Sequence, residues 1–195
     1  MRLAVLLIAV TFVIGLTSCG KKVDHKPYLN TADHPVRNFK MTVTATGLGS
    51  VTGTMTEVDK GIVRINDITY HKMISTAKMP GGRATVETTY YRETEDAVLT
   101  RSSEKASEPE LYVIPLPIRV GKSWPTTILD KKGTKSFESI KDFTQNGKTY
   151  KDCLTIVYKS NDGKMSITEI YAPNYGKVFS ETIMTKGTAT FERVD

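Results

Sequence analysis

Residues 135–171 read KSFESIKDFTQNGKTYKDCLTIVYKSNDGKMSITEIY, and the two turns inside this stretch decide the fold class. Asn146-Gly147 and Asp162-Gly163 are dipeptides that accept the positive φ angles of a type I′ turn at low cost. They divide the stretch into three strand-like runs, at 135–144, 150–159 and 165–171. Strands joined by such short turns pair antiparallel. The stretch therefore predicts a β-meander.

The rest of the chain after residue 38 carries the same signal. Short runs rich in Thr, Val and Ile alternate apolar and polar residues, as half-buried strands do, and helical periodicity is weak. Strands are expected at 41–46, 51–58, 61–75 (with a break near Asn66-Asp67), 84–91, 97–101, 111–114, 177–185 and 188–194, and a polar loop at 102–110. The prediction is one all-β domain over residues 38–195. A barrel or strongly curved sheet is favoured because closure manages exposed edge strands.

The N-terminus resembles the export signal of a bacterial lipoprotein. After Arg2, residues 3–16 form an uncharged apolar run that is shorter than the roughly 20 residues needed to span a bilayer. Leu16-Thr17-Ser18-Cys19 then resembles the lipobox, in which an aliphatic residue and two small residues precede a cysteine. We expect a signal peptide over residues 1–18, cleavage between Ser18 and Cys19, and diacylglycerol on the Cys19 thiol. The alternatives are a plain secretory signal with a chance cysteine, or an uncleaved anchor helix.

A membrane tether is expected to follow the lipid site. Residues 20–37 are polar, contain Pro27 and Pro35, and show no strand or helix periodicity, so 19–37 is predicted to be a flexible tether with solvated His25 and His34. Gly20, rather than Asp, follows the cysteine, and in the Gram-negative sorting pattern this implies the outer membrane. We therefore expect a cell-envelope protein, lipid-anchored to the outer membrane of a Gram-negative bacterium.

Charge distribution and cysteine content argue against a nucleic-acid partner and against an intrachain disulfide. The net charge of +6 is spread along the chain, without a basic run or interleaved aromatic residues, which argues against a nucleic-acid partner. Cys153 is the one cysteine left after Cys19 is acylated, so no intrachain disulfide is expected, and its apolar run predicts a buried inert thiol.

Searches for catalytic patterns give no supported site. Gly121-Lys122-Ser123 resembles the end of a phosphate-binding loop but lacks the required preceding glycine. His71 is the one histidine outside the tether, and Glu93, Glu95 and Asp96 are acids at strand ends or in loops. We predict no catalytic residues, no metal site and no cofactor, and thus a protein that is not an enzyme.

Two segments carry a family resemblance. Residues 114–124, IPLPIRVGKSW, and residues 171–178, YAPNYGKV, flank a cysteine-bearing strand, as do the corresponding elements of the TapB-like family of secreted or lipid-anchored bacterial proteins. The resemblance covers roughly residues 110–185 and departs at Asn174-Tyr175 and Lys177. It implies an antiparallel open or half β-barrel, similar to that of the lipoprotein carriers LolA and LolB. With the strands above, the expected fold is such a barrel of about 9–11 strands following the signal peptide.

Two aromatic residues in these segments are the candidate ligand contacts. Trp124 is the sole tryptophan and is expected to cap the core at one end of the barrel, whereas Tyr171 ends a strand. Either could instead contact a ligand at the barrel mouth.

Three functions are consistent with these features. The leading hypothesis is a non-enzymatic, lipid-anchored envelope protein whose curved sheet holds an apolar small molecule or lipid. The alternative is a structural or adhesive surface module that binds a protein or glycan partner. An enzyme is the third, with His71 and the acids of residues 93–96 as the places to look. The membrane, through the N-terminal lipid, is the one partner the sequence specifies.

Overall fold

The computed structural model describes residues 22–24, 28, 34–105 and 107–195, and all elements assigned in these residues are strands. The all-β prediction is confirmed. Ser18 and Cys19 lie outside the described residues, so cleavage and lipidation stay predictions.

From β2 onward the strands follow one another with short connections, apart from the loop at 102–110 between β6 and β7. In the first half they are β1 (Lys22–Val23), β2 (Val36–Ala45), β3 (Gly49–Ile65), β4 (Ile68–Lys78), β5 (Thr85–Glu93), β6 (Ala97–Arg101) and β7 (Leu111–Pro115). In the second half they are β8 (Ile118–Arg119), β9 (Ser123–Ile128), β10 (Lys131–Gln145), β11 (Lys148–Ser160), β12 (Met165–Ala172), β13 (Gly176–Met184) and β14 (Gly187–Arg193).

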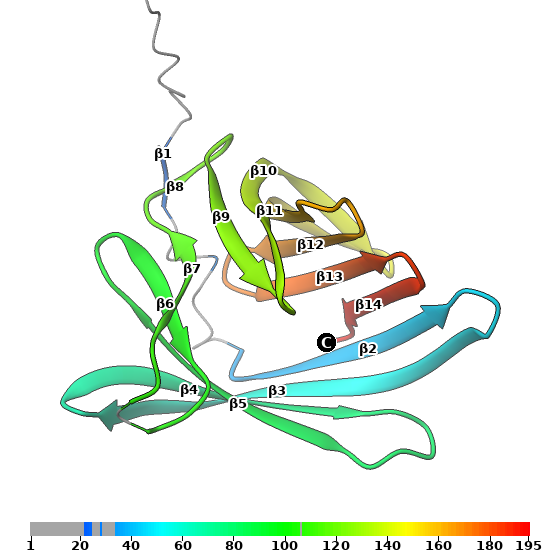
Figure 1. Cartoon of the computed structure of the whole chain (residues 1–195), viewed down its shortest axis with the longest axis horizontal. Coiled ribbons are helices and arrows are strands. Elements are labelled where there is room, and N and C mark those ends of the chain that lie inside the picture. Colours follow the sequence, from blue (N-terminus) through cyan, green and yellow to red (C-terminus); the bar gives the residue numbers. More distant parts are fainter. Residues whose placement is uncertain (1–21, 25–27, 29–33, 106) are drawn as a thin grey trace, which may run out of the picture.

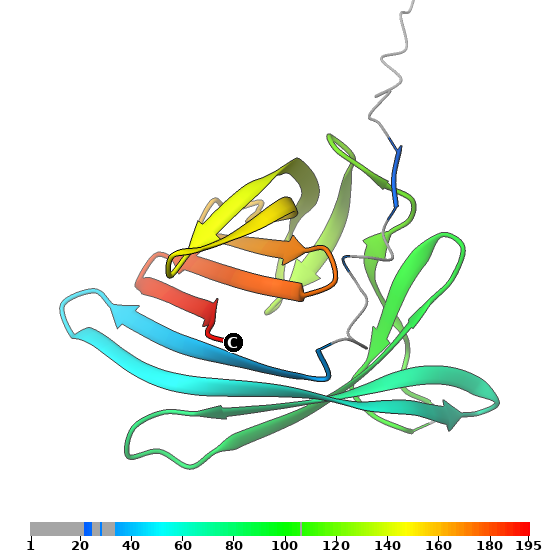
Figure 2. The ribbon, with the colours of Figure 1, turned by 180° about the vertical axis from the view of Figure 1, so that it is seen from behind.

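Twelve of these strands form a single antiparallel sheet in the order β7-β6-β5-β4-β3-β2-β14-β13-β12-β11-β10-β9. The sheet curls into a nearly closed barrel, with β7 and β9 as its edge strands (Figure 1). β14 pairs with β2 in the middle of the sheet, which joins the first and last strands of this sheet along the chain. Figure 2 shows the same arrangement from behind, with long hairpins of β2 to β5 extending beyond the more compact meander of β10 to β14. The open-barrel prediction is confirmed.

The sheet contains more strands than the expected number of about 9–11. The turn at Asn66-Asp67, with φ angles of 49° and 63°, lies at the expected break and separates β3 from β4, but it adds no strand because residues 61–65 continue β3. The additional strand is β9, which contains Pro125 and where no strand was expected. Proline is tolerated there because β9 is an edge strand, where a missing N–H donor leaves no ladder partner unpaired.

The two turns of the 135–171 stretch differ in type. Asn146 and Gly147 have φ angles of 51° and 76°, as predicted for a type I′ turn. At Asp162-Gly163 only the glycine has positive φ, so the type I′ prediction is wrong at this hairpin. The Asp162 carboxylate instead accepts hydrogen bonds from the Ser160 hydroxyl at 2.6 Å and the Lys164 N–H at 3.0 Å. The side chain thereby fixes a longer turn.

Described residues of the expected tether contact the barrel. β1 pairs antiparallel with β8, and Tyr28 is buried and donates a 2.8 Å hydrogen bond to the Asp152 carbonyl. His34 stacks on Tyr175 at 4.6 Å between ring centroids, which differs from the expected solvated histidine. The first residues of β2, Val36 and Arg37, fall within the expected tether range, because their ladder with β3 extends the sheet beyond the predicted strand.

The main hydrophobic core lies between the two edges of the sheet. Its buried members come from β6 to β11 and from the N-terminal segment: Tyr28, Val98, Ile114, Leu116, Ile118, Trp124, Phe137, Leu154 and Ile156. Side-chain packing therefore joins β7 to β9, where no backbone ladder is present in the described sheet. A second cluster around Tyr150, Cys153, Ile170 and Val178 packs on the meander.

The predicted loop at 102–110 is fixed against β4 and β5. Tyr70 donates a 2.7 Å hydrogen bond to Glu110, and Tyr90 donates one of 2.6 Å to Glu104. Arg92 binds both carboxylate oxygens of Glu110, at 2.6 and 2.7 Å. Because strand side chains alternate between faces, this loop covers the face opposite to that of Tyr91.

Phe137 provides a test of the core that closes the barrel, because it is fully buried and its ring lies 4.8 Å from that of Trp124. Phe137→Ala should lower the free energy of unfolding by about 3–5 kcal/mol through lost packing and a residual cavity. Urea denaturation measures this loss. Val86→Ala, at an exposed position of β5, should change stability by about 0.5 kcal/mol or less. Equal losses in the two variants would contradict the assigned core.

Candidate functional site

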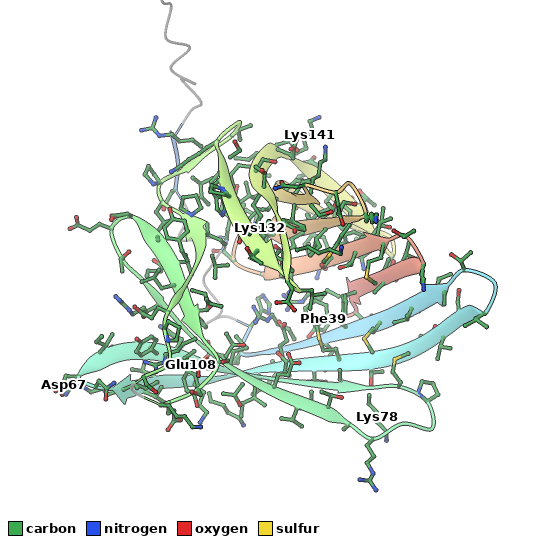
Figure 3. All side chains as sticks on the ribbon, in the orientation of Figure 1. Phe39, Asp67, Lys78, Glu108, Lys132 and Lys141 are labelled. Carbon is green, nitrogen blue, oxygen red and sulfur yellow. The ribbon has the colours of Figure 1, made fainter. Side chains whose placement is uncertain are left out.

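The interior of the barrel holds a half-open cavity of about 280 Å³. Its walls come from β2 to β7 on one side and from β12, β13 and Tyr28 on the other. Figure 3 shows Phe39 of β2 in the barrel interior. The cavity is thus formed where the long hairpins curl against the meander.

One wall of the cavity is apolar. Met73, Val98, Val113 and Ile114 line it from β4, β6 and β7. The rings of Tyr28, Tyr91 and Tyr171 add aromatic surface. This wall would bury an aliphatic or aromatic group without leaving polar atoms unpaired.

The opposite wall carries an ion-paired group. Arg37 and Glu57 are direct cross-strand partners on β2 and β3, and Arg37 Nη2 lies 3.0 Å from Glu57 Oε2. Lys177 Nζ lies 3.9 Å from the other Glu57 oxygen. Arg37 also donates to the Met73 sulfur at 3.3 Å, which connects the charged wall to the apolar one. Because both Arg37 and Glu57 are buried, their pairing offsets a desolvation cost that neither charge could bear alone.

A second ion pair continues this wall along the meander. Lys135 Nζ lies 3.0 Å from Glu169 Oε2, and the Tyr171 hydroxyl donates a 3.4 Å hydrogen bond to Glu169 Oε1. Burial acts to raise the pKa of Glu169, but the Lys135 and Lys177 charges and the hydrogen bonds from Lys135 and Tyr171 outweigh it, so the pKa is lowered. Burial and the charges of Glu169 and Glu57 raise the pKa of Tyr171 well above its ordinary value. Tyr171 is therefore a neutral donor at neutral pH.

The structure gives different positions to Tyr171 and Trp124, the two aromatic residues that the sequence indicated as candidate ligand contacts. Tyr171 lines the cavity and also contacts the core. Trp124 is buried in the core against Phe137, and it is not among the residues that line the cavity. Its indole N–H has no hydrogen-bond partner in the described structure. The core-capping interpretation of Trp124 thus agrees with its position.

His71 lies near two partners that the sequence did not suggest. Its ring stacks on Tyr91 at 5.1 Å between centroids, and its Nδ1 lies 3.9 Å from Asp59 Oδ2. Of the acids at residues 93–96, Glu93 lines the cavity. In the described part of the chain, no three His, Cys, Asp or Glu side chains gather as metal ligands would.

Cys153 agrees with its predicted role. The thiol is free and buried, and it donates a 3.4 Å hydrogen bond to the Tyr150 carbonyl. Burial raises its pKa to about 11, so the reactive thiolate is scarce at neutral pH.

Sequence reasoning missed Arg37, Glu57, Lys177 and Tyr28. Arg37 precedes Phe39 and Met41 by two and four residues, so period-two alternation could have placed it on the inward face of β2. Its position in the expected tether hid this signal. Nothing in the sequence paired it with Glu57, because that contact depends on the β2–β3 register.

Comparison with solved structures shows the fold. A predicted exported protein with a YmcC-like fold from Bacteroides fragilis matches at a TM-score of 0.50 and 10% identity, covering 82% of this chain and 95% of its own. This chain has a YmcC-like fold. A predicted lipoprotein from Parabacteroides distasonis also matches, at a TM-score of 0.45 and 14% identity, covering 83% of this chain and 94% of its own. No protein-family model and no curated protein matches the sequence.

Removing Glu57 should reveal how strongly the charged wall depends on pairing. Glu57→Ala leaves Arg37 as a buried unpaired charge and should lower the free energy of unfolding by about 3–5 kcal/mol. Replacing both partners, as in Arg37→Met with Glu57→Leu, should restore much of this loss, because no buried charge is left unpaired at β2. Urea denaturation of the single and double variants measures the coupling. Strictly additive losses would show that the two side chains do not stabilise each other.

Acid should lower the free energy of unfolding by protonating Glu169, which belongs to the same charged wall. Because the native pKa of Glu169 lies below its ordinary value of 4.5, its contribution to stability is complete above that value and is lost as the pH falls through the native pKa. Unfolding free energies measured from about pH 6 down to about pH 3 should therefore fall less steeply for Glu169→Gln than for the native chain. The exposed Glu138→Gln is the matched control and should keep the native slope. A native slope in Glu169→Gln would contradict the assignment.

Proposed function

We propose that this chain is a lipid-anchored protein of the bacterial cell envelope that holds an apolar or amphiphilic small molecule in its barrel. The interior cavity of about 280 Å³ supports the ligand-binding part. It is close to the lower end of the range of about 300–1,000 Å³ that small-molecule sites occupy. The proposed role is binding, without catalysis and without a cofactor.

The two walls of the cavity favour a particular kind of ligand. An aliphatic or aromatic group would lie against Val98, Val113 and Ile114, where it displaces water from apolar surface. A polar group of the same molecule could hydrogen-bond to Lys177 on the charged wall or to the hydroxyl of Tyr171. A fatty acid or another small lipid combines these two properties.

The sequence supports the cellular location. Leu16-Thr17-Ser18-Cys19 fits cleavage before Cys19 and acylation of its thiol, and two or three acyl chains hold a protein at a membrane almost irreversibly. Gly20 after the cysteine favours the outer membrane of a Gram-negative bacterium. Membership of the TapB-like family, inferred from residues 114–124 and 171–178, is part of the same proposal. No helix in the described part of the chain combines the length and the apolar character needed to cross a bilayer.

A structural or adhesive module is the second candidate. Val43, Val51 and Met184 are exposed, and the registers of β2, β3, β13 and β14 place them on one face of the sheet. Exposed apolar groups that share a face occur at protein-binding surfaces. This surface lies toward the hairpin tips and does not require the cavity.

Filling the cavity tests the proposed function. The purified mature protein should bind a fluorescent fatty acid saturably, and Ser75→Phe, which projects a ring into the cavity from β4, should weaken binding at least about tenfold, or about 1.4 kcal/mol. Val86→Phe, on an exposed part of β5, should bind as the native chain does. Circular dichroism would show that both variants keep the β-fold.

Two results would count against ligand binding in the cavity. One is unsaturable binding by the native chain, which would favour the structural or adhesive module. The other is native affinity in Ser75→Phe, which would place the fatty acid elsewhere on the surface. Mass spectrometry of the native protein would report both the lipid on Cys19 and any co-purifying small molecule.

A further inference from the structure

The position of β1 limits how far the barrel can lie from its lipid anchor. Lys22 of β1 pairs with Arg119 of β8, and Val23 pairs with Ile118. Only Gly20 and Lys21 separate Lys22 from Cys19 in the chain. Three peptide steps reach at most about 11 Å, even when fully extended. A lipid on Cys19 therefore keeps β8 close to the headgroups.

The direction of β1 identifies which part of β8 is nearest. Because β1 and β8 run antiparallel, the first residue of β1, Lys22, lies beside the end of β8 that leads into the turn at 120–122. This turn is anchored to the barrel, since Gly121 N–H donates to the Phe137 carbonyl at 2.8 Å and Phe137 N–H donates to the Lys122 carbonyl at 3.0 Å. Figures 1 and 2 both place β1 and β8 at one end of the molecule, away from β3, β4 and β5.

Charges at this end suit an anionic surface. Arg119 and Lys141 are exposed and Lys122 is half-buried, and Figure 3 shows Lys141 at the same end of the molecule as β8. The exposed acids nearby are Glu138 in β10, Asp24 directly after β1 and Asp152 in β11, whereas Asp142 is paired with Lys151 at 2.5 Å. The sequence adds Lys21 and Lys22 in the short connection to Cys19. The local excess is therefore positive, as expected for a surface near anionic headgroups.

We infer that the β8 end, defined by Arg119, the turn at 120–122 and Lys141, is a membrane-docking surface for an anionic bilayer. The inference rests on the proposed acylation of Cys19 and goes beyond it, because it assigns the face of the barrel that lies on the lipid. In this arrangement the 19–37 segment does not hold the domain clear of the headgroups. It fastens the barrel to them, and the β2–β5 hairpins project away from the bilayer.

Fluorescence quenching on vesicles tests this orientation. The full-length lipidated protein is reconstituted into vesicles of phosphatidylcholine and phosphatidylglycerol that contain a lipid with a headgroup nitroxide. A fluorophore is attached to Ser123→Cys, exposed next to the turn, or to Thr85→Cys, exposed near Lys78 at the opposite end. The native Cys153 is buried with its pKa raised to about 11, so it should label slowly. We expect strong quenching at position 123 and little at position 85.

Charge reversal separates the docking surface from the tether. Arg119→Glu with Lys122→Glu should bring the ratio of quenching at position 123 to that at position 85 toward one on anionic vesicles. Lys78→Glu with Arg83→Glu, which reverses two exposed charges at the other end, should leave the ratio unchanged. High salt should lower the ratio in the native chain, because it screens exposed charges. Ten Gly and Ser residues inserted between Gly20 and Lys21 should also lower it.

The outcomes distinguish the inference from the proposed function. Equal quenching at both positions, or stronger quenching at position 85, in a protein that carries the lipid and floats with the vesicles would overturn the docking surface alone. Absence of lipid on Cys19 in the mass spectrum, together with loss of flotation, would overturn both.

Discussion

The packing of side chains between the two edges of the sheet is the constraint on which the rest of the structure depends. A twelve-stranded twisted sheet leaves two edge strands, β7 and β9, and in the described chain these are not joined by a backbone ladder. Ile114 and Trp124 from the two edges belong to one buried cluster with Phe137, so apolar burial closes what hydrogen bonds leave open. The burial of apolar side chains does not depend on direction. It can therefore join β7 to β9 even though the chain crosses between them through the short strand β8, without the alignment that a backbone ladder requires.

This manner of closure leaves room for the cavity. The core cluster fills the space beside the seam, the line along which the edge strands β7 and β9 approach each other. The long strands β2 to β5 curl past this cluster, so the interior is filled at one side and hollow at the other. The inward positions of β2, β3, β12 and β13 then carry charges in place of apolar residues. Arg37, Glu57, Lys177 and Glu169 remain there because each has a partner of opposite charge within the same barrel.

The N-terminal segment connects the core, the cavity and the β8 end of the barrel. Tyr28 belongs to the core cluster, lines the cavity and donates to the Asp152 carbonyl, while β1 pairs with β8 at the seam. A lipid on Cys19 would thus be coupled mechanically to the same side chains that close the barrel.

The sequence by itself determined the strand content, and it predicts the chemistry of a lipid anchor. Period-two alternation and Asn146-Gly147 specify antiparallel strands locally, because side-chain direction and turn φ depend on neighbouring residues alone. Tyr171 could be singled out from its segment, and it does line the cavity. Leu16-Thr17-Ser18-Cys19 predicts acylation at Cys19 for the same local reason.

Tertiary structure alone decided where the cavity lies and which charges face it. Arg37 meets Glu57 through the β2–β3 register, and Lys177 meets Glu57 although β13 and β3 are distant in sequence. Trp124 could have lined a mouth or filled a core, and only the approach of β7 to β9 placed it in the core. Tyr28 and β1 lie in the predicted tether because a short polar segment carries no local pattern that identifies its partners. Those partners, β8 and Asp152, are distant in sequence and meet the segment only in the folded barrel. Pairing between distant segments is set by register and closure, which no local pattern encodes.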